Sequence, residues 1–139
     1  MNGTGFILTK EQAQKKLLFI HRVFIGFMFL QIVAVLRARK EQPSVDPLFA
    51  KVFLVVALVN ATAVLVLRFF VIPKVDGEAA QQEVGSAKRQ VFYLIAFALS
   101  EAVWAFGLMQ LFIGEPLSTA LVLLSIGLVL MLLCTPRQV

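Results

Sequence analysis

Four long apolar stretches constrain this chain more than any other feature of its sequence. They run from Leu17 to Leu36, Val52 to Ile72, Val91 to Ile113 and Leu117 to Cys134. A helix rises about 1.5 Å per residue, so roughly 20 residues cross a hydrocarbon core of about 30 Å. Each stretch is therefore predicted to be a transmembrane helix. The predicted fold class is all-α, a single four-helix transmembrane domain over residues 1–139.

The composition supports a membrane location. Hydrophobic residues make up 60% of the chain and charged residues only 15%, with a mean hydropathy of +0.89, whereas the apolar share of a soluble domain lies nearer half. No segment between the stretches is long enough for a separate extramembrane domain. The link from Ile113 to Leu117 predicts that the third and fourth helices form a tight antiparallel hairpin.

Local signals predict where the helices begin and end. The motif Thr9-Lys10-Glu11-Gln12 is typical of a capping box before the first helix. Pro47 and Pro116 suit the first turns of the second and fourth helices. Pro73 is expected to close the second helix, because proline lacks the backbone N–H that a helix interior needs.

The net charge of +5 is explained by membrane topology rather than by nucleic-acid binding, because the basic residues lie at the ends of the stretches. If the N-terminus is cytoplasmic, more lysines and arginines lie inside than outside, which is the usual bias. Both termini are therefore predicted to be cytoplasmic, in an inner membrane of the bacterial type. The basic cluster at residues 37–40 argues for the opposite orientation, since it resembles a stop-transfer flank. The inside set is Lys10, Lys15, Lys16, Lys74, Lys88, Arg89 and Arg137, and the outside set is Arg37, Arg39, Lys40 and Lys51.

Glu101 is the only acidic residue within the four stretches. An unpaired charge at mid-bilayer costs on the order of 2.5 to 3.5 kcal/mol, so such a residue is a functional candidate. Asn60 is expected at a matching depth, with Ser100 as a further ligand and with Trp104 and Thr62 lining the site. This set predicts a proton or small-cation site. The alternative is an interhelical hydrogen bond that fixes packing, worth roughly 0.6 to 2 kcal/mol.

A second predicted site lies near the helix ends. His21, Arg22 and Arg68 each fall about one turn inside a stretch, where they are expected to contact lipid headgroups. A bound quinone is the alternative for His21 and Arg68. Gln31 and Gln110 are interpreted as packing residues toward the opposite membrane face.

The sequence lacks the usual signatures of enzymes and cofactor sites. A single cysteine, Cys134, and a single histidine, His21, are too few for the common metal sites, and no HExxH or glycine-rich phosphate loop is present. Ser100 has no base placed to activate it. The segment Lys74 to Gln90, with Asp76-Gly77 as a turn, is interpreted as a solvated loop. We therefore expect no enzyme activity, metal or cofactor.

The third stretch and its basic flank resemble a known family over residues 88–112. The likeness centres on Ala98-Leu99-Ser100-Glu101-Ala102-Val103, followed by Phe106-Gly107-Leu108, and is to the carboxylate-bearing helix of subunit c of the rotary ATP synthase. That resemblance implies that Glu101 binds the translocated proton or sodium ion and that Arg89-Gln90 lies in a cytoplasmic loop. The paired helix of that family carries repeated glycines, whereas the stretch from Val52 to Ile72 has none.

The small multidrug resistance family offers a further comparison, because it also combines four short helices with one intramembrane glutamate. Its glutamate lies in the first helix, so no residue is carried over. The prediction is a small four-helix subunit of an oligomeric membrane complex, with Glu101 binding a proton or cation. The alternatives are a self-contained proton-coupled transporter acting as a homo-oligomer, and a purely structural anchor subunit. The expected partners are the lipid bilayer and either other membrane subunits or copies of the chain itself, and no nucleic acid.

Overall fold

The computed structural model describes residues 8–38, 47–112 and 117–138, and all its regular secondary structure is helical apart from one isolated β-bridge between Thr9 and Val84. Its helices are α1 (Lys10–Ala38), α2 (Pro47–Val66), the π-helical turn η1 (Leu67–Val71), α3 (Ile72–Ala80), α4 (Ala87–Phe112) and α5 (Leu117–Leu133). The elements α2, η1 and α3 follow one another without a break and form one long rod. The all-α prediction is confirmed.

Three of these helices are long and apolar enough to cross a membrane. They are α1, the α2–η1–α3 rod and α4. The fourth, α5, has 17 residues and is about 26 Å long at 1.5 Å per residue, somewhat less than a hydrocarbon core of about 30 Å. The outward surface agrees with a membrane location, since large side chains such as Phe19 and Phe69 are 68% and 61% exposed. Apolar side chains exposed over so much of a surface are typical of a protein that faces lipid.

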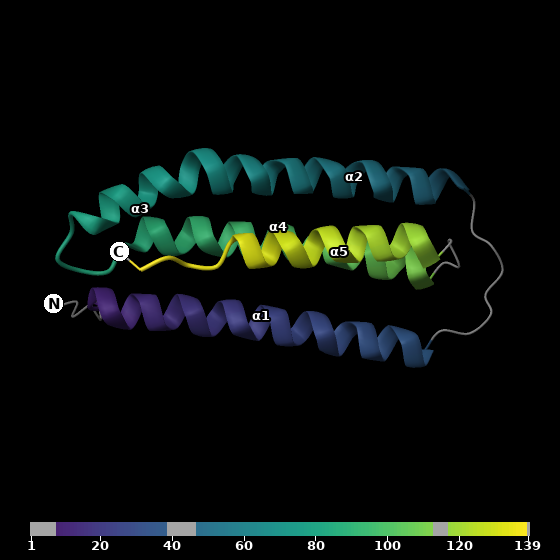
Figure 1. Cartoon of the computed structure of the whole chain (residues 1–139), viewed down its shortest axis with the longest axis horizontal. Helices are drawn as coiled ribbons and strands as arrows, with labels where there is room; N and C mark the ends of the chain where they lie inside the picture. Colours follow the sequence, from purple (N-terminus) through teal and green to yellow (C-terminus); the bar gives the residue numbers. More distant parts are fainter. Residues whose placement is uncertain (1–7, 39–46, 113–116, 139) are drawn as a thin grey trace, which may run out of the picture.

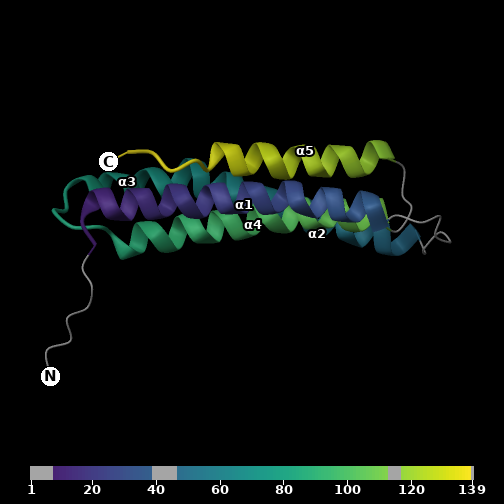
Figure 2. The ribbon, with the colours of Figure 1, turned by 90° about the horizontal axis from the view of Figure 1, so that it is seen from below.

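The chain reverses direction between α1, the α2–η1–α3 rod, α4 and α5, so the start of α1 and the end of α5 lie at the same end (Figure 1). We call this the terminal end; it holds the start of α1, the end of α3, the start of α4 and the end of α5. Helix α4 lies in the centre, packed against α5, α2 and α1. Helices α1 and α2 lie on opposite sides of the α4–α5 pair (Figures 1 and 2). The arrangement is therefore layered around α4, unlike a closed ring of four helices.

The N-terminal signals of α1 and α2 are confirmed. The backbone N–H of Gln12 donates to Thr9 Oγ1 at 3.2 Å, and the backbone N–H of Thr9 donates to Gln12 Oε1 at 3.0 Å. This reciprocal pair is a capping box, so α1 begins at Lys10, well before the apolar stretch itself. Pro47 is the first residue of α2, as expected, while Pro116 lies outside the described residues.

The prediction that Pro73 closes the second helix is wrong. The rod continues to Ala80 through a π-helical turn, in which the backbone N–H of Ile72 donates to the carbonyl of Leu67, five residues back. A proline ring in a regular α-helix collides with the carbonyl four residues before it, and a π-type turn widens the helix at that point. The Asp76-Gly77 turn is also wrong, because both residues lie within α3.

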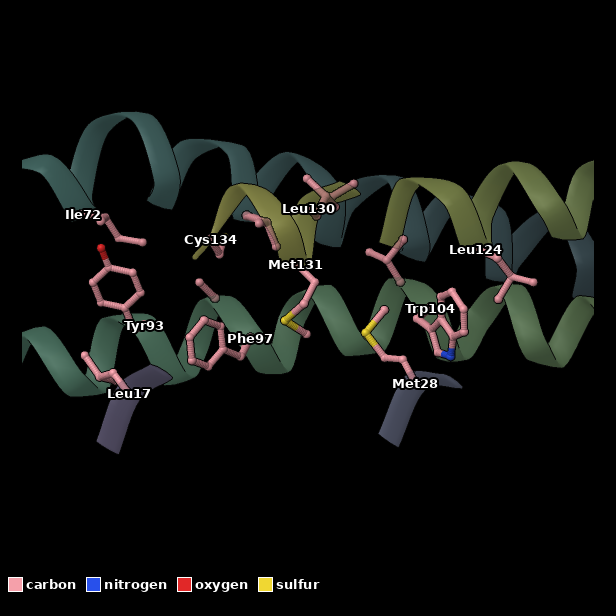
Figure 3. Packing of buried hydrophobic residues seen from close by; sticks show 14 of the residues in the cluster. Leu17, Met28, Ile72, Tyr93, Phe97, Trp104, Leu124, Leu130, Met131 and Cys134 are labelled. Carbon is pink, nitrogen blue, oxygen red and sulfur yellow. The ribbon is translucent and has the colours of Figure 1, made fainter. Parts of the chain in front are cut away.

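Two glycines bring α4 and α5 into close contact, as the predicted hairpin requires. A Cβ atom at Gly127 would lie 2.8 Å from the backbone nitrogen of Trp104, and one at Gly107 would lie 3.0 Å from that of Leu124. Backbone atoms cannot move aside as flexible side chains do, so both positions need glycine. Around this contact, the interior is filled by side chains from every layer, including Met28 of α1, Ile72 of α3, Phe97 of α4 and Met131 of α5 (Figure 3).

Candidate functional site

Helix α4 places Glu101 deep in the apolar part of the molecule. The residue lies 14 positions after Ala87 and 11 before Phe112, the two ends of α4, or about 21 Å and 16 Å along the axis. The residue as a whole is partly exposed, but both of its carboxylate oxygens are enclosed. The exposed part of Glu101 is therefore not its carboxyl group.

Neither carboxylate oxygen of Glu101 has a hydrogen-bond partner among the described residues. The polar side chain next to this carboxyl is the amide of Gln31 in α1. It lies close to the carboxyl but makes no hydrogen bond of normal geometry with it. The Oε1 atom of Gln31 is itself enclosed and unbonded. Sequence reasoning missed Gln31 as a site residue, because the stagger of α1 against α4 cannot be obtained by counting residues within each helix.

Trp104 adds a donor to the same interface. Its side chain is 3% exposed, and its indole nitrogen has no acceptor in the described part of the chain. The nitrogen points toward α1, on the side where Met28 lies (Figure 3). The interface between α1 and α4 thus holds four enclosed polar atoms without hydrogen bonds, namely both Glu101 oxygens, Gln31 Oε1 and Trp104 Nε1. We call Glu101, Gln31 and Trp104 the central set.

The remaining residues expected around Glu101 are not joined to it by hydrogen bonds. Asn60 is half-buried in α2 and is not among the groups that interact electrostatically with the Glu101 carboxyl. The Ser100 hydroxyl donates to the carbonyl of Ala96 at 2.8 Å. The hydroxyl of Thr62 is exposed and donates to the carbonyl of Leu58 at 2.9 Å. Bonds of this kind to the carbonyl one turn earlier satisfy Ser and Thr within their own helix.

The residues of the second predicted site differ in their surroundings, and no hydrogen bond joins them within the described residues. His21 is buried, and its Nε2 lies 2.8 Å from the carbonyl oxygen of Met131, so Nε2 is the protonated nitrogen and the bond ties α1 to α5. Its ring also packs against Phe97, with centroids 5.1 Å apart. Arg22 is exposed on α1, whereas Arg68 is 8% exposed on the inner side of η1. His21 thus joins α1 to α5, and the two arginines occupy different surroundings, while the contact with a headgroup or quinone stays a prediction.

A cluster at the terminal end was missed by the sequence interpretation of residues 74–90 as a solvated loop. Arg89 is 3% exposed. Its Nε donates to Asp76 Oδ1 at 2.8 Å, its Nη1 to Gln14 Oε1 at 2.9 Å, and its Nη2 to the carbonyl of Arg137. The Tyr93 hydroxyl donates to Asp76 Oδ2 at 3.0 Å, and the Arg89 guanidinium lies 5.0 Å from the Tyr93 ring centroid. We call these residues the Arg89 cluster.

The Arg89 cluster joins four parts of the chain. Gln14 comes from α1, Asp76 from α3, Arg89 and Tyr93 from α4, and Arg137 from the segment after α5. Each of the three guanidinium nitrogens donates a hydrogen bond to an acceptor, so the arrangement is that of a structural ion pair. The signal that could have revealed it is the spacing of Ile72, Val75 and Ala79, which are buried on one face of α3.

The central set can hold a proton or a small cation. One carboxylate and one amide oxygen are hard oxygen donors, which suit small ions of low charge better than soft metals. No group of three or more His, Cys, Asp or Glu side chains suited to a metal occurs in the described residues. Comparisons with family models, with curated proteins and with solved structures find no match for this chain.

Proposed function

We propose that this protein is a small subunit of an ion-handling membrane assembly, in which Glu101 binds and releases a proton or a small cation. The observation that carries the proposal is the enclosed Glu101 carboxyl, which has no hydrogen bond from the described residues. Buried polar groups are almost always hydrogen-bonded, and the exceptions occur where a group has another use. A carboxyl in the apolar part of a membrane helix has the same implication.

The geometry favours this role over interhelical glue. A glutamate that fixes helix packing does so by a hydrogen bond to a neighbouring helix, whereas the Glu101 oxygens make none within the described residues. The amide of Gln31 lies beside them and is suited to stabilise the ionised form. A proton or a small cation supplies the positive charge that the carboxylate needs at this depth.

The proposal of a larger assembly rests on two features. Glu101 is the single acidic residue of the apolar stretches, and pathways across a membrane usually need several polar groups. The outward faces of α1 and α2 carry many exposed apolar residues, including Leu30 and Val59, which suit lipid, another subunit or a second copy of the chain. We place both termini in the cytoplasm, because the basic residues are more numerous at the terminal end.

Labelling with dicyclohexylcarbodiimide tests whether Glu101 takes up a proton. This apolar reagent attacks protonated carboxyl groups within a membrane. We expect mass spectrometry of the labelled protein to show modification at Glu101, with none at Glu83, which is exposed in the connection between α3 and α4. Protection by sodium or potassium at constant pH would identify a bound cation, and its absence would leave the proton. Failure of Glu101 to react at any pH would contradict the proposal.

Ion flux measured in vesicles tests the function itself. The protein is extracted gently with whatever subunits accompany it, identified by native mass spectrometry, and reconstituted. Glu101→Gln is expected to abolish proton or cation flux, while the matched control Glu83→Gln retains it. Equal flux for both variants would overturn the proposal. Heterologous subunits in the spectrum would support the assembly, and a homo-oligomer would support a self-contained transporter.

A further inference from the structure

Arg68 is a buried cation without a hydrogen-bond or ion-pair partner among the described residues. Its side chain is 8% exposed and lies in the π-helical turn Leu67–Val71. Within the described residues it makes no hydrogen bond, and the ion pairs of those residues involve other side chains. Arg89 is buried to a similar degree, but each of its three guanidinium nitrogens donates a hydrogen bond. Burying a charge without a partner is costly, so the isolation of Arg68 calls for a ligand.

The neighbours of Arg68 cannot neutralise it. The next acidic residue along the rod is Asp76, eight positions further on, and its two oxygens are occupied by Arg89 and Tyr93. The thiol of Cys134 lies within electrostatic range of the guanidinium, but a thiol is a weak acceptor and carries no charge. An anion from outside the chain is therefore the fitting partner.

The position of Arg68 indicates what kind of anion it meets. It lies 20 residues after Leu48, where the second candidate span begins, or about 30 Å along the helix axis. That length equals the hydrocarbon thickness of a typical bilayer, so Arg68 lies where phosphate groups of lipids are found. Its nitrogens make no hydrogen bond and yet are not among the enclosed, unbonded polar atoms of the described residues, so they are open to a ligand at that level.

We propose that Arg68 and the π-helical turn around it form a binding site for a phosphate group. The planar guanidinium fork matches phosphate oxygens in pairs, and π-type turns often occur at functional sites. Exposed Lys16 and Lys74 at the terminal end add positive charge, which attracts anionic lipids. The phosphate belongs either to an anionic lipid headgroup or to inorganic phosphate. This site is independent of Glu101 and of the ion-handling role.

Lipid binding is measured by native mass spectrometry on the full chain in an uncharged detergent. Phosphatidylglycerol and phosphatidylcholine are added separately to the unaltered protein, to Arg68→Gln and to Arg22→Gln. Arg22 is the matched control, because it is a basic residue exposed on the surface of α1. We expect phosphatidylglycerol to be retained at least tenfold more than phosphatidylcholine, and this preference to be lost in Arg68→Gln and kept in Arg22→Gln.

A second arm separates the two sources of phosphate. Inorganic phosphate is added to the lipid-free protein at constant ionic strength, with chloride as the reference salt, and thermal unfolding is followed. A rise in Tm that disappears in Arg68→Gln would assign the site to free phosphate. If neither phosphatidylglycerol nor phosphate distinguishes Arg68→Gln from the unaltered protein, the proposal is overturned.

The melting temperature of Arg68→Gln gives an independent test, because a ligand-binding role and a structural role of Arg68 predict changes of opposite sign. In uncharged detergent without phosphate or lipid, Arg68→Gln removes an unpaired buried charge and is expected to raise Tm. An arginine that holds the fold together would give the reverse. Arg68→Gln that melts at a lower temperature, or fails to fold, would show that the chain itself satisfies the guanidinium and would overturn the proposal.

Discussion

The Arg89 cluster and the central set both enclose polar side chains, but those of the Arg89 cluster are hydrogen-bonded and those of the central set are not. In the Arg89 cluster, an arginine and an aspartate are joined by a 2.8 Å ion pair, and a tyrosine, a glutamine and a backbone carbonyl complete the bonding. In the central set, a glutamate, a glutamine and a tryptophan lie at one interface with four enclosed atoms unbonded. The two regions lie on the same helix, α4.

This difference separates stability from function within one molecule. The Arg89 cluster fixes the ends of three helices and the C-terminal segment, so its polar groups are used up by the fold. The four enclosed side-chain atoms of the central set make no hydrogen bonds within the described residues, so they remain available to a proton or an ion. Ionisable groups inside a membrane protein are expensive and are retained for use. Variants of the two regions should therefore differ in what they change.

The largest loss of stability is expected from Arg89→Ala. The variant leaves the Asp76 carboxylate, whose side chain is 13% exposed, without its charged partner, which costs about 3 to 5 kcal/mol of unfolding free energy. Thermal or denaturant unfolding in detergent measures the loss. The matched control is Lys88→Ala, whose partner Glu78 lies 2.9 Å away with both side chains more than half exposed; exposed pairs contribute about 0 to 1 kcal/mol. Equal effects of the two substitutions would contradict the structural role of Arg89.

The closest comparison of the two regions uses the same chemical change in each. Asp76→Asn removes the charge that Arg89 pairs with and is expected to cost about 1.5 to 3 kcal/mol. Glu101→Gln removes no hydrogen bond and is expected to change stability by less than about 0.5 kcal/mol. Unfolding measured side by side checks both. A large loss in Glu101→Gln would show that Glu101 is structural and would reverse the comparison.

The contact between α4 and α5 behind the central set gives a third prediction. Gly127→Ala places a Cβ 2.8 Å from the backbone nitrogen of Trp104, so the helices must separate at a cost of about 1 to 3 kcal/mol. Gly26 is the control, because nothing lies within 4 Å of its added Cβ. There, alanine should be neutral or stabilise the helix by about 0.5 to 1 kcal/mol. Equal melting temperatures for the two variants would contradict the close approach.

The sequence predicted the fold well where local chemistry decides the outcome. The capping box at Thr9, the start of α2 at Pro47 and the apolar stretches were all readable, because caps, prolines and hydrophobic runs act over one or two turns. The predicted helix end at Pro73 was wrong because a π-helical turn accommodates the proline. That turn depends on tertiary packing of the rod, through buried residues such as Ile72 and Val75. The predicted turn at Asp76-Gly77 was wrong because Asp76 pairs with Arg89, which lies 13 residues away across a chain reversal.

The candidate site was predictable in its carboxylate but not in its neighbours. Glu101 stands out in sequence because charge is rare inside apolar stretches. Asn60 was assigned to it by depth alone, yet depth does not say which helix faces which, and the carboxyl meets Gln31 of α1. The layered arrangement, with α1 and α2 on opposite sides of the α4–α5 pair (Figure 1), explains why the two polar amides are not equivalent.

The smallest expected effect distinguishes these two amides. Gln31→Leu removes the polar neighbour of the Glu101 carboxyl, so the ionised form loses support and carbodiimide labelling at a fixed pH should become roughly two- to tenfold faster. A polar contact without a regular hydrogen bond contributes no more than such a bond does, about 0.5 to 1.5 kcal/mol, and 1.4 kcal/mol is a factor of ten. Asn60→Leu, the matched change in α2, should leave the labelling rate unaltered. If Asn60→Leu accelerates labelling and Gln31→Leu does not, the site lies between α2 and α4, and the interface with α1 serves packing instead.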